Sequence, residues 1–173
     1  TEASGDKLSL KLPGVQEDLL ELLAQTGKPL IVALFAGSPL DLRKVDRLAN
    51  AVIQAWYPGQ DGGQALVEIL FGDFNPSGRL PVTFYASLDQ VPPFEDYSMD
   101  NRTYRYFKGQ PLYGFGYGLS YSSFAYHGLK LSSETIEAGE PLTVEAEVEN
   151  TSKVAGDEVA ELYIEYPQRP GAA

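Results

Sequence analysis

The sequence contains no cysteine and only one histidine, His127. Without cysteine the chain has neither a disulfide framework nor a thiolate metal site, and its redox compartment stays undecided. With one histidine it cannot build a metal site from two or three imidazoles, and a Ser-His-Asp triad would depend on His127 alone. Neither AGSPL nor GLSYS forms the G-x-S-x-G pattern, so His127 is interpreted as a surface or structural histidine.

Long apolar runs and excess positive charge are also missing. The longest apolar run, 30–36, is far too short to span a bilayer. The opening TEASGDKLSL lacks the basic start and apolar stretch of a signal peptide, so the export route cannot be read from it. The formal net charge of -11 disfavours nucleic acid and anionic membranes as partners, because both would repel the chain.

What the sequence does contain is a globular composition, 43% hydrophobic and 21% charged, arranged in alternating helical and strand patterns. Apolar residues at helical spacing predict helices, and short continuous apolar runs predict strands, 30–36 being expected to be covered on both faces. The expected helices are 15–25, 40–48 and 63–71, and the expected strands are 30–36, 51–56 and 80–84. This alternation predicts a layered α/β sandwich with a mostly parallel sheet.

The second part of the chain has a different texture. Residues 86–118 are rich in proline and aromatic residues, which indicates an ordered functional loop or a linker. Apolar residues then alternate with polar ones in LTVEAEVE (142–149) and EVAELYIEY (158–166), as in half-buried strands of an antiparallel sandwich. A complete sandwich needs roughly seven strands and ~100 residues. We therefore expect an incomplete second domain, and a chain that is part of a longer polypeptide.

The stretch AWYPGQDGGQAL (55–66) has the glycines of a phosphate-binding loop but not its other residues. A P-loop needs lysine and Ser/Thr after its last glycine, whereas Gln64-Ala65 follows Gly63. The glycines do not fit G-x-G-x-x-G either, and Asp61 would repel a phosphate at a helix N-terminus. The stretch is interpreted as a strand-to-helix turn capped by Asp61.

Two sets of side chains are candidates for function. Glu2 and Asp6 lie in a loop before the first expected helix, where a catalytic acid can sit, although most loop acids are only solvated. The tyrosine-rich segment 94–124 suits sugar stacking or a protein interface, and packing between two domains explains it equally well. Residue types alone leave these alternatives open.

Four segments together resemble glycoside hydrolase family 3, the β-glucosidase and β-xylosidase family. In chain order they are EASGDKLSLKLPGVQEDLLELLAQTGKPLIVALFAGSPL, AWYPGQDGGQALVEILFGDFNPSGRLPVTF, RTYRYFKGQPLYGFGYGLSYSSF and VENTSKVAGDEVAELYI. The resemblance implies that residues 1–121 are most of an α/β sandwich domain whose start is missing. It also implies that residues 122–173 are the first strands of a truncated fibronectin type III-like domain.

The resemblance further implies a retaining, exo-acting β-glycosidase for terminal β-linked glucosides or xylosides. Its nucleophilic aspartate would belong to a missing N-terminal barrel domain, and this chain alone would be inactive. Glu2 is the candidate acid/base, with an upstream glutamate as the alternative. The resemblance implies no metal or organic cofactor, a secreted or periplasmic location, and leaves a homodimer open. The rival interpretations are a non-catalytic carbohydrate-binding module and a structural brace for the barrel.

Overall fold

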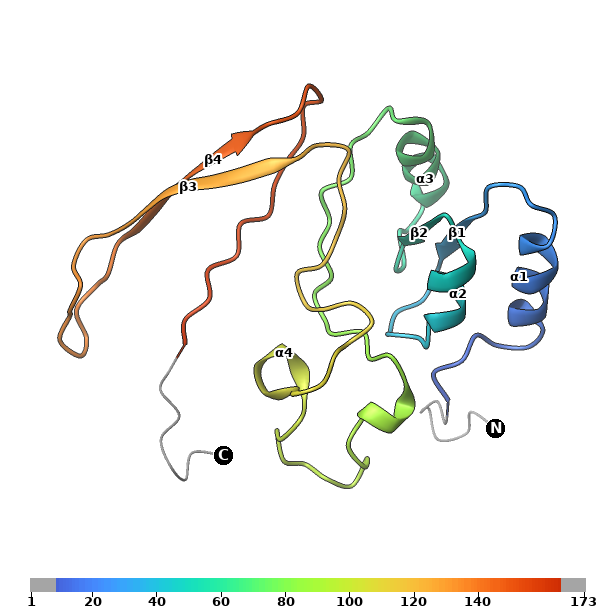
Figure 1. The fold of residues 1–173 in the computed structure, drawn as a ribbon, viewed down its shortest axis with the longest axis horizontal. Helices are drawn as coiled ribbons and strands as arrows, with labels where there is room; N and C mark the ends of the chain where they lie inside the picture. Colours follow the sequence, from blue (N-terminus) through green and yellow to red (C-terminus); the bar gives the residue numbers. More distant parts are fainter. Residues whose placement is uncertain (1–8, 166–173) are drawn as a thin grey trace.

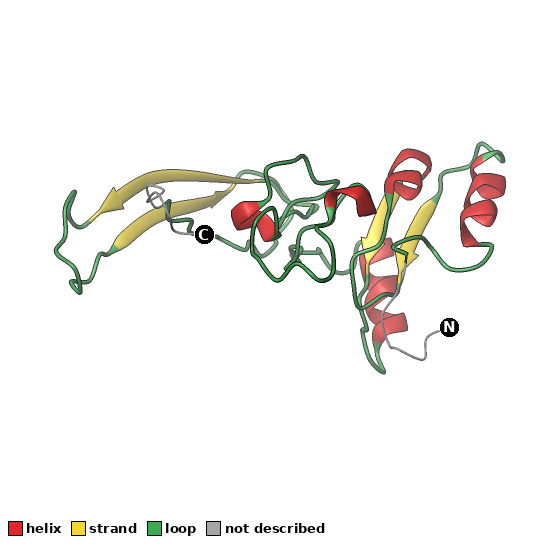
Figure 2. Ribbon diagram, turned by 90° about the horizontal axis from the view of Figure 1, so that it is seen from below, coloured by secondary structure: helices red, strands yellow, loops and turns green. Residues whose placement is uncertain are grey.

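A computed structural model describes residues 9–165 of the chain and shows a mixed α/β fold. Figure 2 shows the long hairpin and the helix-rich part at opposite ends, with a loop-rich segment between them. The elements in order are α1 (Gln16–Ala24), β1 (Ile31–Leu34), α2 (Arg43–Leu48), β2 (Ala51–Gln54), α3 (Gly62–Phe71), the 3-10 turn η2 (Leu88–Gln90), α4 (Thr103–Tyr106), β3 (Phe124–Leu131) and β4 (Val144–Asn150).

The first two strands form a parallel pair, as predicted. β1 aligns with β2 from Ile31 opposite Ala51 onward, and α2 provides the crossover between them (Figure 1). Side chains extend the pairing at both ends. The Leu30 amide donates to Asn50 Oδ1 at 2.8 Å, and Gln54 Nε2 donates to the Ala36 carbonyl at 2.9 Å. This βαβ arrangement is the framework on which the first half of the chain is built.

Helices α1 and α2 lie where the apolar periodicity predicts them and are tied together by charge. Lys44 Nζ on α2 lies 2.9 Å from both Glu17 Oε2 and Glu21 Oε1 on α1. Helix α1 ends at Ala24, shortly before the expected Gly27, whose φ of 69° is the left-handed conformation that glycine tolerates. Nearby residues therefore determine where α1 ends, and the ion pairs with Lys44 on α2 hold α1 in its orientation.

The hydrophobic core covers only one face of the sheet. The buried apolar side chains are Leu20, Leu34, Ala36, Leu40, Leu42, Val45 and Phe84. The prediction that strand 30–36 is covered on both faces is wrong, because Ile31 and Phe35 are 52% and 55% exposed. Alternate residues of a strand point to opposite faces, so Leu34 and Ala36 reach the core while Ile31 and Phe35 point away from it.

The predicted strand 80–84 is not formed as a continuous strand. It runs beside the later segment 112–117 with only one isolated bridge, between Phe84 and Tyr113. Hydrogen bonds occur at its two ends, where Leu80 N donates to the Tyr117 carbonyl and Phe84 N to the Tyr113 carbonyl, both at 2.9 Å. Pro81 has no amide hydrogen to donate, so a regular ladder cannot pass through this segment.

The second part of the chain contains an antiparallel pair, β3 and β4, with a register shift between His127 and Lys130. The predicted strand 142–149 corresponds to β4, but it is not half-buried, because Val148 on it is 46% exposed. The predicted strand 158–166 is not formed within its described part, 158–165. A two-stranded pair has no second layer to bury its apolar side chains, so the alternating pattern alone does not produce burial.

Tyr113 joins the segment 112–117 to α2, and its hydroxyl donates to Asp46 Oδ1 at 2.5 Å. Burial first, and then this bond to the carboxylate, raise the pKa of Tyr113 well above its ordinary value. The stability that the neutral phenol contributes is therefore fully present below the ordinary tyrosine pKa and is lost as the pH rises through the raised value.

We expect Tyr113→Phe to lower the free energy of unfolding by about 1 kcal/mol at neutral pH, because it removes this hydrogen bond. Between about pH 9 and 11 the loss of stability should be shallower in the variant than in the unmodified protein. Urea unfolding across this range measures both effects, with Tyr97→Phe as control, since Tyr97 is 87% exposed. Equal pH slopes for Tyr113→Phe and the unmodified protein would contradict the assignment.

Candidate functional site

The stretch 55–66 connects β2 to α3, as the sequence predicted, and its glycines allow close approach of side chains. A side chain at Gly62 would collide with the ring of Pro58, and one at Gly37 would collide with the ring of Tyr57. The prediction that the Asp61 side chain caps α3 is wrong, because Asp61 occupies the N-cap position without a side-chain hydrogen bond to the helix. The stretch is therefore a tightly packed turn rather than an anion cradle.

The predicted acid/base candidate, Glu2, and its neighbour Asp6 lie outside the described residues. His127 lies on β3, is 54% exposed, and has Nε2 at 3.4 Å from Glu149 Oε2 on β4. This agrees with the surface histidine that the sequence favoured. None of the helices in residues 9–165 is long and apolar enough to cross a membrane. Within the same range, no three Asp, Glu or His side chains gather to hold a metal ion.

The loop before α4 is shaped by one guanidinium group. Arg102 donates from Nε to the Ser98 carbonyl at 3.0 Å, and from Nη2 to the carbonyls of Pro93 at 3.0 Å and Asp96 at 2.5 Å. The residues on either side, Asn101 and Thr103, both have positive φ values, 56° and 53°. Non-glycine residues adopt this conformation only where their surroundings hold them in it. Segment 93–103 is thus an ordered loop, one of the two interpretations that the sequence offered.

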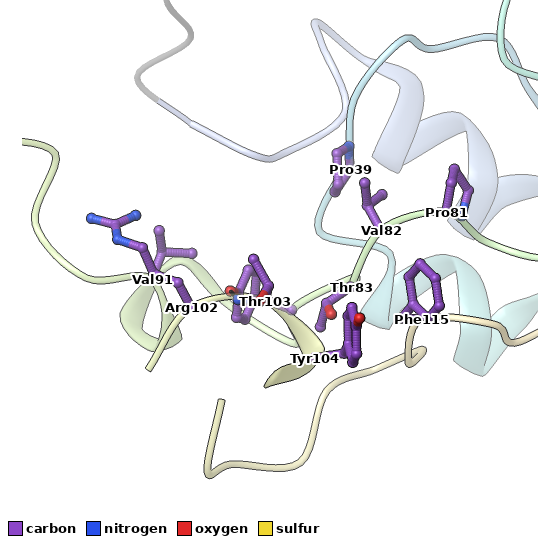
Figure 3. A pocket seen from close by; sticks show the side chains of 10 residues that line it. Pro39, Pro81, Val82, Thr83, Val91, Arg102, Thr103, Tyr104 and Phe115 are labelled. Carbon is purple, nitrogen blue, oxygen red and sulfur yellow. Dashed lines mark hydrogen bonds between the residues drawn. The ribbon is translucent and has the colours of Figure 1, made fainter. Parts of the chain in front are cut away.

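Beside this loop lies a cavity of about 380 Å³. It is lined by side chains from three parts of the chain, shown in Figure 3: Pro39 beyond the carboxyl end of β1, the segment from Pro81 to Tyr85, and residues of the aromatic region including Val91, Arg102, Thr103, Tyr104 and Phe115. Its size is within the range of small-molecule sites, and its walls are mostly apolar. It is a concave site that brings together residues far apart in the sequence.

One wall of this cavity consists of two stacked aromatic rings. The rings of Tyr104 and Phe115 are 4.5 Å apart with an angle of 24° between their planes. The ring of Tyr163 packs against Tyr104 at 5.9 Å with nearly perpendicular planes. Nearby, Tyr85 and Phe107 form a perpendicular pair at 5.0 Å. Three aromatic residues of the segment 94–124, Tyr104, Phe107 and Phe115, therefore pack with Tyr85 and Tyr163 at the cavity.

The two parts of the chain are joined through one amide side chain. Asn75 Nδ2 donates to Ser122 Oγ at 2.8 Å and to the Ala155 carbonyl at 2.9 Å. Asn75 Oδ1 accepts from Ser120 Oγ at 2.9 Å and from the Tyr121 amide at 2.8 Å. Both N–H groups of Nδ2 and both acceptor positions of Oδ1 are therefore used. An asparagine side chain has this combination of donors on one atom and acceptors on the other.

An ion pair reinforces this junction. Arg79 Nη2 lies 2.7 Å from Glu158 Oε2, and both side chains are mostly buried, at 13% and 17% exposure. The Tyr126 hydroxyl, on β3, donates to the other oxygen of the same carboxylate at 3.0 Å. We refer to Asn75, Arg79, Tyr126 and Glu158 as the junction cluster. The sequence around Asn75 does not reveal this role, because its partners lie 45 or more positions away.

Comparison with known proteins shows which family the chain resembles. The model of the glycosyl hydrolase family 3 C-terminal domain matches residues 1–121. A xylan 1,4-β-xylosidase of Xylanibacter ruminicola is 45% identical over 96% of this chain and 19% of that protein. A periplasmic β-glucosidase of Salmonella typhimurium is 40% identical over 95% of this chain and 23% of that protein.

Solved structures show the same fold. The β-glucosidase of Listeria innocua in complex with isofagomine superimposes with a TM-score of 0.75 at 30% identity, over 88% of this chain and 23% of that one. β-Glucosidase 3B of Thermotoga neapolitana gives 0.73 at 34% identity, over 84% and 23%. The chain spans about a fifth of the length of the curated relatives that it matches. It belongs to glycosyl hydrolase family 3, within the C-terminal domain of that family.

Proposed function

We propose that this chain is part of a retaining, exo-acting β-glycosidase that removes terminal β-linked glucose or xylose. The observation that carries the proposal is the 45% identity to a xylan 1,4-β-xylosidase over 96% of the chain. The chain supplies the acid/base side of the pocket, and a barrel domain elsewhere in the full-length protein supplies the nucleophilic aspartate. We infer a secreted or periplasmic location because the similar protein of Salmonella typhimurium is called a periplasmic β-glucosidase.

The proposed mechanism needs two carboxyl groups about 5 to 5.5 Å apart. The barrel aspartate attacks the anomeric carbon while Glu2 gives its proton to the departing glycosidic oxygen. Glu2, now a carboxylate, then takes a proton from water, and the water oxygen displaces the aspartate from the anomeric carbon. The sugar leaves with its original β configuration, and both carboxyl groups return to their starting protonation states.

The exposed apolar surface supports docking of this chain against further protein. On and just before α1, Val15, Leu19 and Leu22 are 73%, 54% and 63% exposed. They recur at helical spacing and so form a stripe along one side of α1. On α3, Phe71 is 79% exposed. Apolar side chains gathered in this way are typical of surfaces covered by another domain or chain.

A second candidate function is that of a non-catalytic module, which either braces the barrel or binds carbohydrate without reacting with it. The junction cluster favours bracing, because the Arg79–Glu158 pair and the Asn75 amide fix the first part of the chain to the second. The full-length protein would then be active, and Glu2 would have no part in the chemistry.

The proposal is tested by assaying aryl β-glucosides and aryl β-xylosides with the full-length protein and with the 173-residue chain alone. We expect hydrolysis by the full-length protein only, with the β anomer as the first product seen by proton NMR. Hydrolysis by the isolated chain would refute the division of roles between two domains. An initial α anomer would refute the retaining mechanism.

A further inference from the structure

The cavity beside α4 has a rigid aromatic wall. The Tyr104 and Phe115 rings are stacked at 4.5 Å, and Tyr163 supports Tyr104 edge-on. Tyr104 is 51% exposed, so part of its ring remains open to solvent. Figure 3 shows Tyr104 beside Phe115, with Thr83 next to it. A ring held in place by two others loses little conformational entropy when a ligand packs on it.

The polar groups at this cavity are hydroxyls rather than free charges. Tyr85 Oη accepts a hydrogen bond from the Thr103 amide at 3.2 Å, which leaves its own proton to donate. Tyr104 and Thr103, which also line the cavity, each carry a hydroxyl. Arg102 is the charged side chain among the described residues of the lining, and its guanidinium is bound to three backbone carbonyls and points away from the aromatic pair (Figure 3).

The residues that line the cavity indicate which kind of ligand it can bind. Among residues 9–165, no lysine, aspartate or glutamate lines the cavity. Because the chain carries a net charge of -11, an anion would also be repelled from its surroundings. A neutral ligand with a flat apolar face and hydroxyls along its edge matches an aromatic wall bordered by tyrosine and threonine hydroxyls.

We propose that this cavity binds a pyranose unit of a neutral β-linked oligosaccharide. The apolar face of the sugar ring packs against the solvent-exposed part of the stacked Tyr104–Phe115 pair, and the Tyr85 hydroxyl donates to a ring hydroxyl. The choice of a β-linked saccharide rests on the proposed function, whereas the preference for a neutral ligand with one apolar face rests on the cavity alone. The site would hold a longer substrate to the protein through a sugar unit of its own.

The test is isothermal titration of the full-length protein with thio-linked xylotriose and thio-linked cellotriose, which resist hydrolysis. We expect Tyr104→Ala and Phe115→Ala each to weaken binding about tenfold. Val82→Trp fills the cavity and leaves both rings in place, and it should weaken binding to a similar extent. Tyr97→Ala, at a tyrosine that does not line the cavity, is the matched control. Thermal unfolding of each variant separates lost binding from lost folding.

The outcomes distinguish this inference from the proposed function. Equal affinities for the unmodified protein, the folded ring variants and Val82→Trp would overturn the cavity proposal, whether or not the protein hydrolyses aryl glycosides. Binding of phenol at this cavity without binding of either saccharide would overturn it as well. Binding that depends on Tyr104 in a protein that hydrolyses no glycoside would support the cavity proposal and refute the glycosidase.

Discussion

Replacing Glu2 by glutamine in the full-length protein is expected to lower kcat/KM for aryl β-glycosides by about 10²-fold or more. Glutamine keeps the size and hydrogen-bonding shape of glutamate but cannot give a proton to the glycosidic oxygen or take one from water. The loss should be largest for poor leaving groups, because these depend most on protonation. Steady-state kinetics on a series of aryl glycosides with different leaving-group pKa values measures this dependence.

Chemical rescue adds a second readout. With Glu2→Ala and an activated leaving group, azide should restore part of the turnover by attacking the glycosyl-enzyme intermediate in place of activated water, giving a β-glycosyl azide. Asp6→Asn, at an acidic residue four positions along the sequence, is the matched control and should keep most of the activity. Unchanged turnover in Glu2→Gln would remove Glu2 from the mechanism, and would favour an upstream glutamate or the bracing function.

Replacing Asn75 is expected to cause the largest loss of stability among single changes at the junction. Asn75→Ala leaves the Tyr121 amide and the Ala155 carbonyl without their partner and removes one hydrogen bond from each of two serine hydroxyls. Each buried polar group left unpaired costs about 1–3 kcal/mol, and water will reach some of them because the site is half-buried. We therefore expect a net loss of about 2–4 kcal/mol, measured by calorimetry on the full-length protein.

Asn75→Asp isolates the role of the amide donors. A carboxylate still accepts from Tyr121 N and Ser120 Oγ, but it presents oxygen to the Ala155 carbonyl. Ser122 Oγ cannot compensate, since its proton is already donated to the Val154 carbonyl at 2.6 Å. We expect Asn75→Asp to be nearly as destabilising as Asn75→Ala at neutral pH. Limited proteolysis should then cut between the two parts of the chain.

Gln60→Ala, at an exposed amide in the turn before α3, is the control for loss of an amide side chain and should have little effect. If Asn75→Asp and Gln60→Ala were equally stable and equally resistant to proteolysis, the Asn75 hydrogen bonds would not hold the junction. Because neither residue lines the cavity, the outcome is independent of sugar binding there.

Helices α1, α2 and α3 and the first two strands could be predicted because their signals are local. Helix α1 begins near the predicted position and ends as expected before Gly27, and β1 and β2 coincide with the two apolar runs in the first sixty residues. Leucines at helical spacing show which side of a helix is apolar within a few turns. This pattern can be recognised without knowing which element the helix packs against. The family was also within reach, because long motifs in a fixed order identify it without coordinates.

The burial of the strands and the location of the candidate site were harder to predict from the sequence. The apolar run 30–36 predicts a strand but not whether one or both faces are covered, and the structure covers one. The alternation in 142–149 predicts β4 but does not supply the second layer that would bury Val148. Segment 80–84 fails as a strand because its pairing depends on residues 112–117, whose hydrogen bonds avoid Pro81. In each case the missing information is the identity of a distant neighbour.

Residue types and motifs were enough to identify the family, the mixed α/β elements and the turn at 55–66, and to exclude phosphate and thiolate chemistry. Those properties depend on residue type and spacing within a few turns of chain. The folded structure was needed to show that Asn75 joins two parts of the chain, that Arg102 shapes a loop, and that Tyr104 and Phe115 meet at a cavity. Hydrogen bonds and ring contacts act over a few ångströms in space, and no local pattern reveals which distant residues folding brings together.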